Sequence, residues 1–212
     1  MSSSVPANRP QMKRKDLLKM LKDAHPDFVL PDLFFVGIRG YYLDSMGVAG
    51  QNDRKIYDDA IFIVGKEEMI AYNANTDPSA FKLSIATLKP GVWPVYKFDM
   101  HKGQYLALCQ RGGPVTVIRD GKGEDTGNFG INIHRGGVNG TGSLGCQTIP
   151  VDQFGKILKC DKVICDGFII AARTLAKKYL GSSYMSAIYT YVLLENKPAT
   201  APVAVKTEEI KS

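Results

Sequence analysis

The chain has little of what marks a metal centre, a disulfide scaffold or a membrane span. Its 212 residues include three histidines, four cysteines and one tryptophan. No two cysteines form a CxxC pair, which excludes the common zinc and thioredoxin-like motifs. No run of about 18 apolar residues occurs, so we expect no transmembrane segment. The net charge of +6 is modest and lies partly in the run MKRKDLLKMLK, so we expect no nucleic-acid partner.

The four cysteines are expected to be free thiols. The first fifteen residues lack the apolar core of a signal peptide, which predicts synthesis in the reducing cytoplasm. We interpret Cys109, Cys160 and Cys165 as small buried apolar residues. Cys160 and Cys165 frame the stretch CDKVIC, which is poor zinc spacing without further ligands. Cys146 differs, because it lies in a glycine-rich stretch beside a histidine.

What the sequence does contain is enough apolar material for one packed domain. Apolar residues make up 44% of the chain and aromatic residues 9%. Residues 1–30 are predicted to form an N-terminal tail, disordered over 1–11, and a short amphipathic helix over 12–24. We expect a single catalytic domain over 31–196 and a disordered C-terminal tail over 197–212.

The pattern of apolar residues predicts a mostly β fold. Residues 34–130 contain short runs rich in Val, Ile, Tyr and Phe, which favour an antiparallel sandwich or partly open barrel. Further on, VDQFGKILK predicts a short helix capped by Asp152, and VICDGFIIAARTLAKKYLG a longer helix that stops at Gly181. SAIYTYVLLEN returns to a strand pattern. The predicted class is therefore α+β, with a short N-terminal helix and one or two helices after Cys146.

The stretch FGINIHRGGVNGTGSLGCQTIP, residues 129–150, carries the residues with the most chemistry. His134 and Cys146 are separated by eleven residues. A thiol reacts as the thiolate, and a nearby imidazole can take its proton. A glycine-rich turn can fold back to bring the two together, and Gly145 lets backbone N–H groups approach a developing oxyanion. The set predicts cysteine-dependent acyl transfer.

Other interpretations of this stretch stay open. A Cys and a His in one loop are often unrelated. A metal site on His134 and Cys146 needs further ligands, for which His101 and Asp99 in FDMHKG are the candidates. A phosphate-binding loop needs the Lys-Ser/Thr ending of a P-loop, which HRGGVNGTG lacks. We expect no metal and no cofactor.

The segment IHRGGVNGTGSLGCQTIP resembles the signature of the L,D-transpeptidase catalytic domain, the YkuD-type family. That family carries an upstream His, a variable stretch and then Ser/Thr-His-Gly-Cys, which His134, Ser143, Gly145 and Cys146 match. TLKPGVWPVYKF resembles the family's strand opening, NFGINIH its approach to the histidine, and PVDQFGKIL the short helix after the cysteine. The resemblance covers about residues 57–160, and its specific part is under twenty residues long.

The resemblance implies a catalytic role for each matching position. Cys146 would be the nucleophile and His134 its base. The backbone carbonyl of Arg135 would orient the imidazole. The amide N–H groups around Leu144, Gly145 and Cys146 would form the oxyanion hole.

The candidates for substrate binding are Ser143, Leu144, Thr148 and Gly136. Ser143 is expected to form hydrogen bonds within the loop or to touch substrate. Leu144 stands where the family usually has a second His, and Thr148 where it has Arg or Asn. The contact that this Arg or Asn would make with a substrate carboxylate is then missing, or Arg135 supplies it. The alternative for Arg135 is a surface residue without a role in binding.

The resemblance also implies a YkuD-like fold and a substrate class, peptidoglycan stem peptides. The thiolate would attack a carbonyl at the L-centre of diaminopimelate and expel a D-amino acid, and an amine or water would resolve the thioester. The departures from the pattern indicate a phage or prophage branch, either a lysin that reaches the wall after release or a virion protein. The N-terminal helix could contact a virion or wall partner. The alternatives are an inactive wall-binding or virion module with the same fold, and a cytosolic cysteine hydrolase of another amide.

Overall fold

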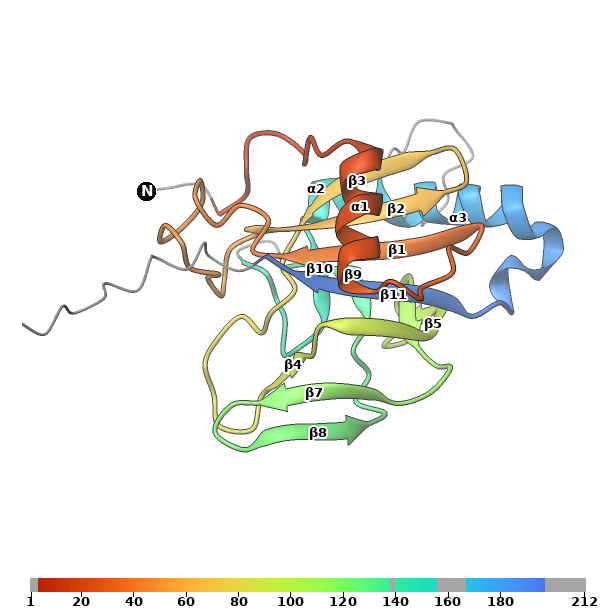
Figure 1. The fold of residues 1–212 in the computed structure, drawn as a ribbon. Helices are drawn as coiled ribbons and strands as arrows, with labels where there is room; N and C mark the ends of the chain where they lie inside the picture. The colour runs from red at the N-terminus through yellow and green to blue at the C-terminus, as the bar shows by residue number, and fades with distance from the viewer. Residues whose placement is uncertain (1–3, 138–139, 156–166, 197–212) are drawn as a thin grey trace, which may run out of the picture.

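The structure is a computed structural model that describes residues 4–137, 140–155 and 167–196. Within these residues the fold is mixed α+β and mostly β, with an eight-stranded sheet that curves into a nearly closed barrel and a separate three-stranded sheet (Figure 1). The predicted α+β class with a partly open barrel is confirmed at this level. The predicted tail over 197–212 lies outside the described residues.

The larger sheet brings together strands from both ends of the chain. Its strands are β1 (Leu33–Arg39), β2 (Asp59–Gly65), β3 (Met69–Ala74), β5 (Gly91–His101), β6 (Tyr105–Gln110), β9 (Ile133–Arg135), β10 (Gln147–Ile149) and β11 (Tyr189–Glu195). Their order is β10-β9-β6-β5-β11-β1-β2-β3. The smaller sheet has the order β4-β7-β8, from β4 (Ala86–Leu88), β7 (Val115–Arg119) and β8 (Gly123–Gly127).

The predicted N-terminal helix is present as α1 (Arg14–Ala24). Its buried residues Leu17 and Leu21 are four positions apart and therefore lie on one face of the helix. That face packs on Phe34 and Val36 of β1, and Figure 1 shows α1 lying across the sheet. The helix therefore covers this face of the domain.

Both faces of β1 and β2 are buried, which explains why these strands read as continuous apolar runs. Side chains alternate between the faces, so Phe34 and Phe62 join the cluster under α1. Phe35 and Ile63 point the other way, into the larger core, where Phe168 of α3 (Phe168–Leu180) also packs.

Two helices follow the strand β10, as predicted, although the shorter one differs in its cap. The helix α2 (Val151–Phe154) ends at Gly155, whose φ is +83°. The prediction that Asp152 caps it is wrong, because Pro150 occupies the cap position and Asp152 lies in the first turn. The helix α3 stops at Gly181 as predicted, with a φ of +55°, and the 3₁₀ helix η1 (Gly181–Met185) follows. The predicted beginning of α3, over 163–166, lies outside the described residues.

The predicted disorder of the first residues is wrong for 4–11, which lie against the domain. The Tyr57 backbone N–H donates to the Ser4 carbonyl at 2.8 Å. The Asn73 side chain donates to the Asn8 carbonyl at 3.1 Å. Backbone groups of this segment therefore find partners on the sheet and on the loop after β1.

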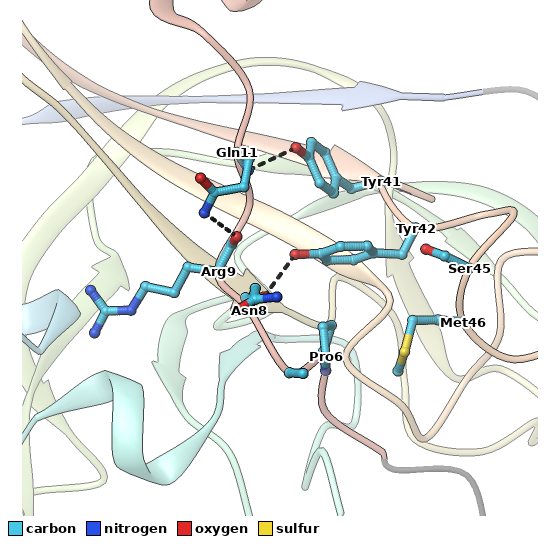
Figure 2. A pocket seen from close by; sticks show the side chains of 9 residues that line it. Pro6, Asn8, Arg9, Gln11, Tyr41, Tyr42, Ser45 and Met46 are labelled. Carbon is cyan, nitrogen blue, oxygen red and sulfur yellow. Dashed lines mark hydrogen bonds between the residues drawn. The ribbon is translucent and has the colours of Figure 1, made fainter.

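A hollow of about 330 Å³ lies between this segment and the aromatic pair Tyr41 and Tyr42 (Figure 2). The Tyr41 hydroxyl accepts a hydrogen bond from the Gln11 backbone N–H at 3.2 Å, and the Tyr42 hydroxyl donates to the Asn8 carbonyl at 3.2 Å. None of the residues that line the hollow belongs to the stretch 129–150.

The sheet closes through a bridge between Asn75, just after β3, and Thr148 in β10. Each residue donates its backbone N–H to the carbonyl of the other at 2.8 Å. Strand β10 is therefore held from both sides, by β9 and by this bridge. Among the described helices, none is long and apolar enough to cross a membrane.

The cysteines within the described residues are free thiols, as expected. Cys109 is fully buried, and burial raises its pKa to about 11. Cys146 is half-buried. Cys160 and Cys165 lie outside the described residues.

Candidate active site

The parallel pairing of β9 and β10 brings the two ends of the glycine-rich stretch together. Thr148 pairs with His134, and Gln147 with Ile133, so Cys146 comes level with Asn132. Strands lie about 4.8 Å apart and rise about 3.3 Å per residue, which places the Cα atoms of residues 134 and 146 about 8 Å apart. Thr148 and His134 are paired and face the same side of the sheet, and Cys146 lies in the bend just before β10.

The imidazole of His134 is held in one orientation. Its Nδ1 lies 2.7 Å from the Arg135 carbonyl oxygen, which can only accept, so Nδ1 carries the hydrogen. The other nitrogen, Nε2, is then free to accept a proton. The Tyr105 hydroxyl lies 3.4 Å from Nδ1. This is the carbonyl contact that the family resemblance implies for Arg135.

The His134 ring is neutral at physiological pH. Burial, then the neighbouring His101, lower its pKa to about 4, against the opposing effect of the Arg135 carbonyl. A neutral imidazole can act as a base, whereas an imidazolium cannot.

The thiol of Cys146 is also neutral at rest. Burial raises its pKa, while the Asn132 N–H and the charge of Lys102 act in the opposite direction. The Asn132 backbone N–H donates to Sγ at 3.4 Å, and the thiol donates to the Gly130 carbonyl at 3.3 Å. Within the part of the chain that the structure describes, the imidazole is not a hydrogen-bond partner of the thiol.

The backbone at Gly145 permits only glycine. Its φ is +131°, and a Cβ there would lie 2.4 Å from the Ala86 carbonyl oxygen. Its N–H donates to the Ser143 hydroxyl at 3.0 Å, so the expected oxyanion donor at this position is already engaged. In the described residues, the N–H groups of Leu144 and Cys146 have no hydrogen-bond partner and remain as donors.

Three of the four candidates for substrate binding are buried, and Ser143 makes the hydrogen bonds within the loop that are one of its two expected roles. Ser143 is 1% exposed, and its hydroxyl donates to the Cys146 carbonyl at 2.7 Å. Thr148 is fully buried under the bridge to Asn75. Gly136 is buried, and a Cβ there would overlap the Tyr57 hydroxyl. These residues shape the loop and cannot touch a ligand without its movement.

The remaining candidates are accessible. Leu144 is 80% exposed, immediately before Gly145. Arg135 is half-buried, and its guanidinium lies 5.0 Å from the centre of the Tyr105 ring. A cation over an aromatic face is an attractive arrangement that fixes the side chain.

Sequence reasoning missed three residues that surround the pair. His101 stacks on His134, Asn132 contacts both His101 and the thiol, and Tyr105 contacts His134. His101 entered the sequence analysis only as a metal-ligand candidate. In the described residues no three side chains of His, Cys, Asp or Glu cluster to hold a metal ion. The sequence offered one signal for His101, because the chain has only three histidines.

The site thus consists of a neutral, oriented imidazole on β9 and a neutral thiol just before the parallel strand β10, with a glycine-only turn before the thiol. Comparisons with protein families, with curated proteins and with solved structures gave no match to this chain.

Proposed function

We propose that the chain is a cysteine-dependent acyl-transfer enzyme, with Cys146 as nucleophile and His134 as base. The observation that carries this proposal is the hydrogen bond from His134 Nδ1 to the Arg135 carbonyl at 2.7 Å. It leaves Nε2 as the proton acceptor, in a residue whose strand pairs with the strand that directly follows Cys146. Nucleophile, base and orienting group are the parts that covalent catalysis by a thiol requires.

Both groups are neutral at rest, so the proton moves when substrate is bound. Cys146 exchanges its hydrogen bond to Gly130 for one to His134, and Nε2 takes the thiol proton as Sγ attacks the amide carbonyl. The oxyanion receives N–H donors from Leu144 and Cys146. The tetrahedral intermediate expels the amine, which takes the proton from His134, and leaves a thioester on Cys146. An amine or water then attacks the thioester and restores the thiol.

The proposed substrates are peptidoglycan stem peptides. The proposal is based on the resemblance of the stretch around Cys146 to the signature of the L,D-transpeptidase family, which has the YkuD-type fold. Such peptides carry free carboxylates. The positive charge of Lys102 acts on both His134 and Cys146, and Arg135 adds a second cation beside the imidazole. A positive field favours a negatively charged peptide. On the same likeness, we propose a phage or prophage protein that acts on the wall after release or within a virion.

Intact-protein mass spectrometry tests this proposal. The wild type, Cys146→Ala and Cys109→Ala are each incubated with tetrapeptide muropeptides and, separately, with a carbapenem. We expect one covalent adduct on the wild type and on Cys109→Ala, and none on Cys146→Ala. The released fragments distinguish hydrolysis from exchange. An adduct that persists in Cys146→Ala, or no turnover and no adduct in the wild type, would refute the proposal.

A second candidate is an inactive wall-binding or virion module. The hydrogen bond of the thiol to Gly130 and the raised pKa of Cys146 favour it, because both stabilise an unreactive thiol. The buried Ser143 and Thr148 agree with it as well. Binding to purified peptidoglycan that is equal in the wild type and Cys146→Ala, without turnover by either, would select this candidate.

A further inference from the structure

His101 lies outside the glycine-rich stretch but touches the proposed base directly. It is the last residue of β5, and its side chain is buried. Its ring lies on the His134 ring, with the centroids 4.1 Å apart and the planes 23° from parallel. This face-on contact restricts the His134 ring, because it opposes both tilting and flipping of the imidazole.

Asn132 holds the His101 ring in turn. The Asn132 Oδ1 accepts a hydrogen bond from the Gln110 backbone N–H at 2.9 Å, which decides the orientation of the amide. Its Nδ2 therefore donates to His101 Nδ1 at 3.1 Å. In the neutral ring of His101 the hydrogen is then on Nε2.

The same residue contacts the nucleophile. The backbone N–H of Asn132 donates to Cys146 Sγ, whereas its side chain fixes His101. One residue of the chain thus sets the position of the thiol directly and that of the imidazole through the stacked ring. Supporting contacts of this kind determine how accurately a catalytic pair is aligned.

The charges around the pair allow it one proton at most. His134 faces His101 and Lys102 from the end of β5 and its turn, Tyr105 from β6, and Arg135 from its own strand. Two stacked imidazolium rings about 4 Å apart, beside these cations, would repel each other strongly.

We infer that His101 is a positioning residue, which holds His134 in the base-competent orientation and tautomer by ring stacking. The effect of His101 on catalysis rests on the proposed function. The stacked ring keeps Nδ1–H on the Arg135 carbonyl, which leaves Nε2 as the nitrogen that can take the thiol proton.

Nitrogen-15 NMR of the imidazoles in the full chain tests the positioning without any substrate. The variants are His101→Ala, which removes the stack, His101→Phe, which restores an aromatic ring, and His25→Ala as the matched control. We expect His134 of the wild type, His101→Phe and His25→Ala to show one protonated and one unprotonated nitrogen. In His101→Ala both nitrogens should have averaged shifts. A wild-type tautomer in His101→Ala would overturn the inference.

Kinetics with the muropeptide of the adduct experiment supply the second measurement. In His101→Ala kcat should fall about 10- to 100-fold, the scale expected for a misaligned base, while KM changes less than about threefold. His101→Phe should recover most of the loss. A kcat loss that is equal in both variants would overturn the stacking mechanism. If no variant or wild type turns over muropeptide, the proposed function fails, and the tautomer result still decides the role of His101.

Discussion

The glycine before Cys146 gives the sharpest test of the described geometry. In Gly145→Ala the new Cβ would lie 2.4 Å from the Ala86 carbonyl oxygen, at a φ of +131°. A non-glycine residue in such a conformation costs about 1–3 kcal/mol. Overlap with a backbone atom adds about 1–3 kcal/mol, because neither strand can move freely. We therefore expect the free energy of unfolding to fall by about 4 kcal/mol.

The matched control is Gly103→Ala. Gly103 has a φ of +69°, but a Cβ there would meet open space. Only the left-handed conformation then costs free energy, about 1 kcal/mol. The two variants change the same atoms, so their difference of about 3 kcal/mol reports the contact with Ala86 together with the greater backbone strain at the φ of residue 145.

Urea unfolding followed by the fluorescence of Trp93, the single tryptophan, measures this difference. Its indole nitrogen donates to the Lys89 carbonyl at 3.0 Å, so unfolding changes its surroundings. With an m-value of about 2 kcal/mol per molar, the midpoints of the two variants should differ by about 1.5 M urea. Equal midpoints would refute the close approach of residues 145 and 86.

Three further variants test other parts of the structure. Ser143→Ala should lower the free energy of unfolding by about 1–3 kcal/mol, because it leaves the buried partners of the Ser143 hydroxyl unpaired. Ser186 is exposed, so Ser186→Ala should change the free energy of unfolding by less than about 0.5 kcal/mol. Equal losses in urea unfolding would contradict a structural role of the Ser143 hydroxyl. Asp58 is buried, which raises its pKa to about 7, so between about pH 4 and 7 its carboxyl holds a proton in the folded protein that it releases in the unfolded chain, and the stability that this group contributes falls as pH rises through this window. Asp59, with a raised pKa, and His134, with a lowered one, add slopes of their own. Calorimetry from pH 4 to 8 should therefore show that the stability of the wild type relative to Asp58→Asn falls as pH rises; parallel curves would count against it. Leu17→Ala should cost about 2–5 kcal/mol, since it opens a cavity under α1, and a loss below about 1 kcal/mol in urea unfolding would show that the helix is not docked.

Features of the fold that depend on neighbouring residues could be predicted from the sequence. The spacing of Leu17 and Leu21 identifies α1, and Gly181 ends α3 because a positive φ favours glycine there. The cap at Asp152 was predicted wrongly, because Pro150 precedes it and takes the cap position. Local patterns therefore predict which helices and strands form. They predict the ends of these elements less well, because adjacent residues compete for the cap position.

The surroundings of the candidate site could not be predicted, because they depend on strands far apart in the sequence. His101 reaches His134 only through the order β5, β6 and β9 in the sheet. Thr148 is buried because Asn75 pairs with it across the closure of the barrel. The sequence shows that His134 and Cys146 share one glycine-rich stretch, and the pairing of β9 with β10 brings the two ends of that stretch together.

The place of β11 has a consequence for how the chain folds. Although it follows the other described strands along the chain, β11 lies between β5 and β1, antiparallel to the first and parallel to the second. Without β11, the strands β10-β9-β6-β5 and β1-β2-β3 form two groups that meet at the bridge between Asn75 and Thr148. Long-range pairing of this kind slows folding. The barrel therefore cannot complete itself during synthesis until residue 195 has left the ribosome.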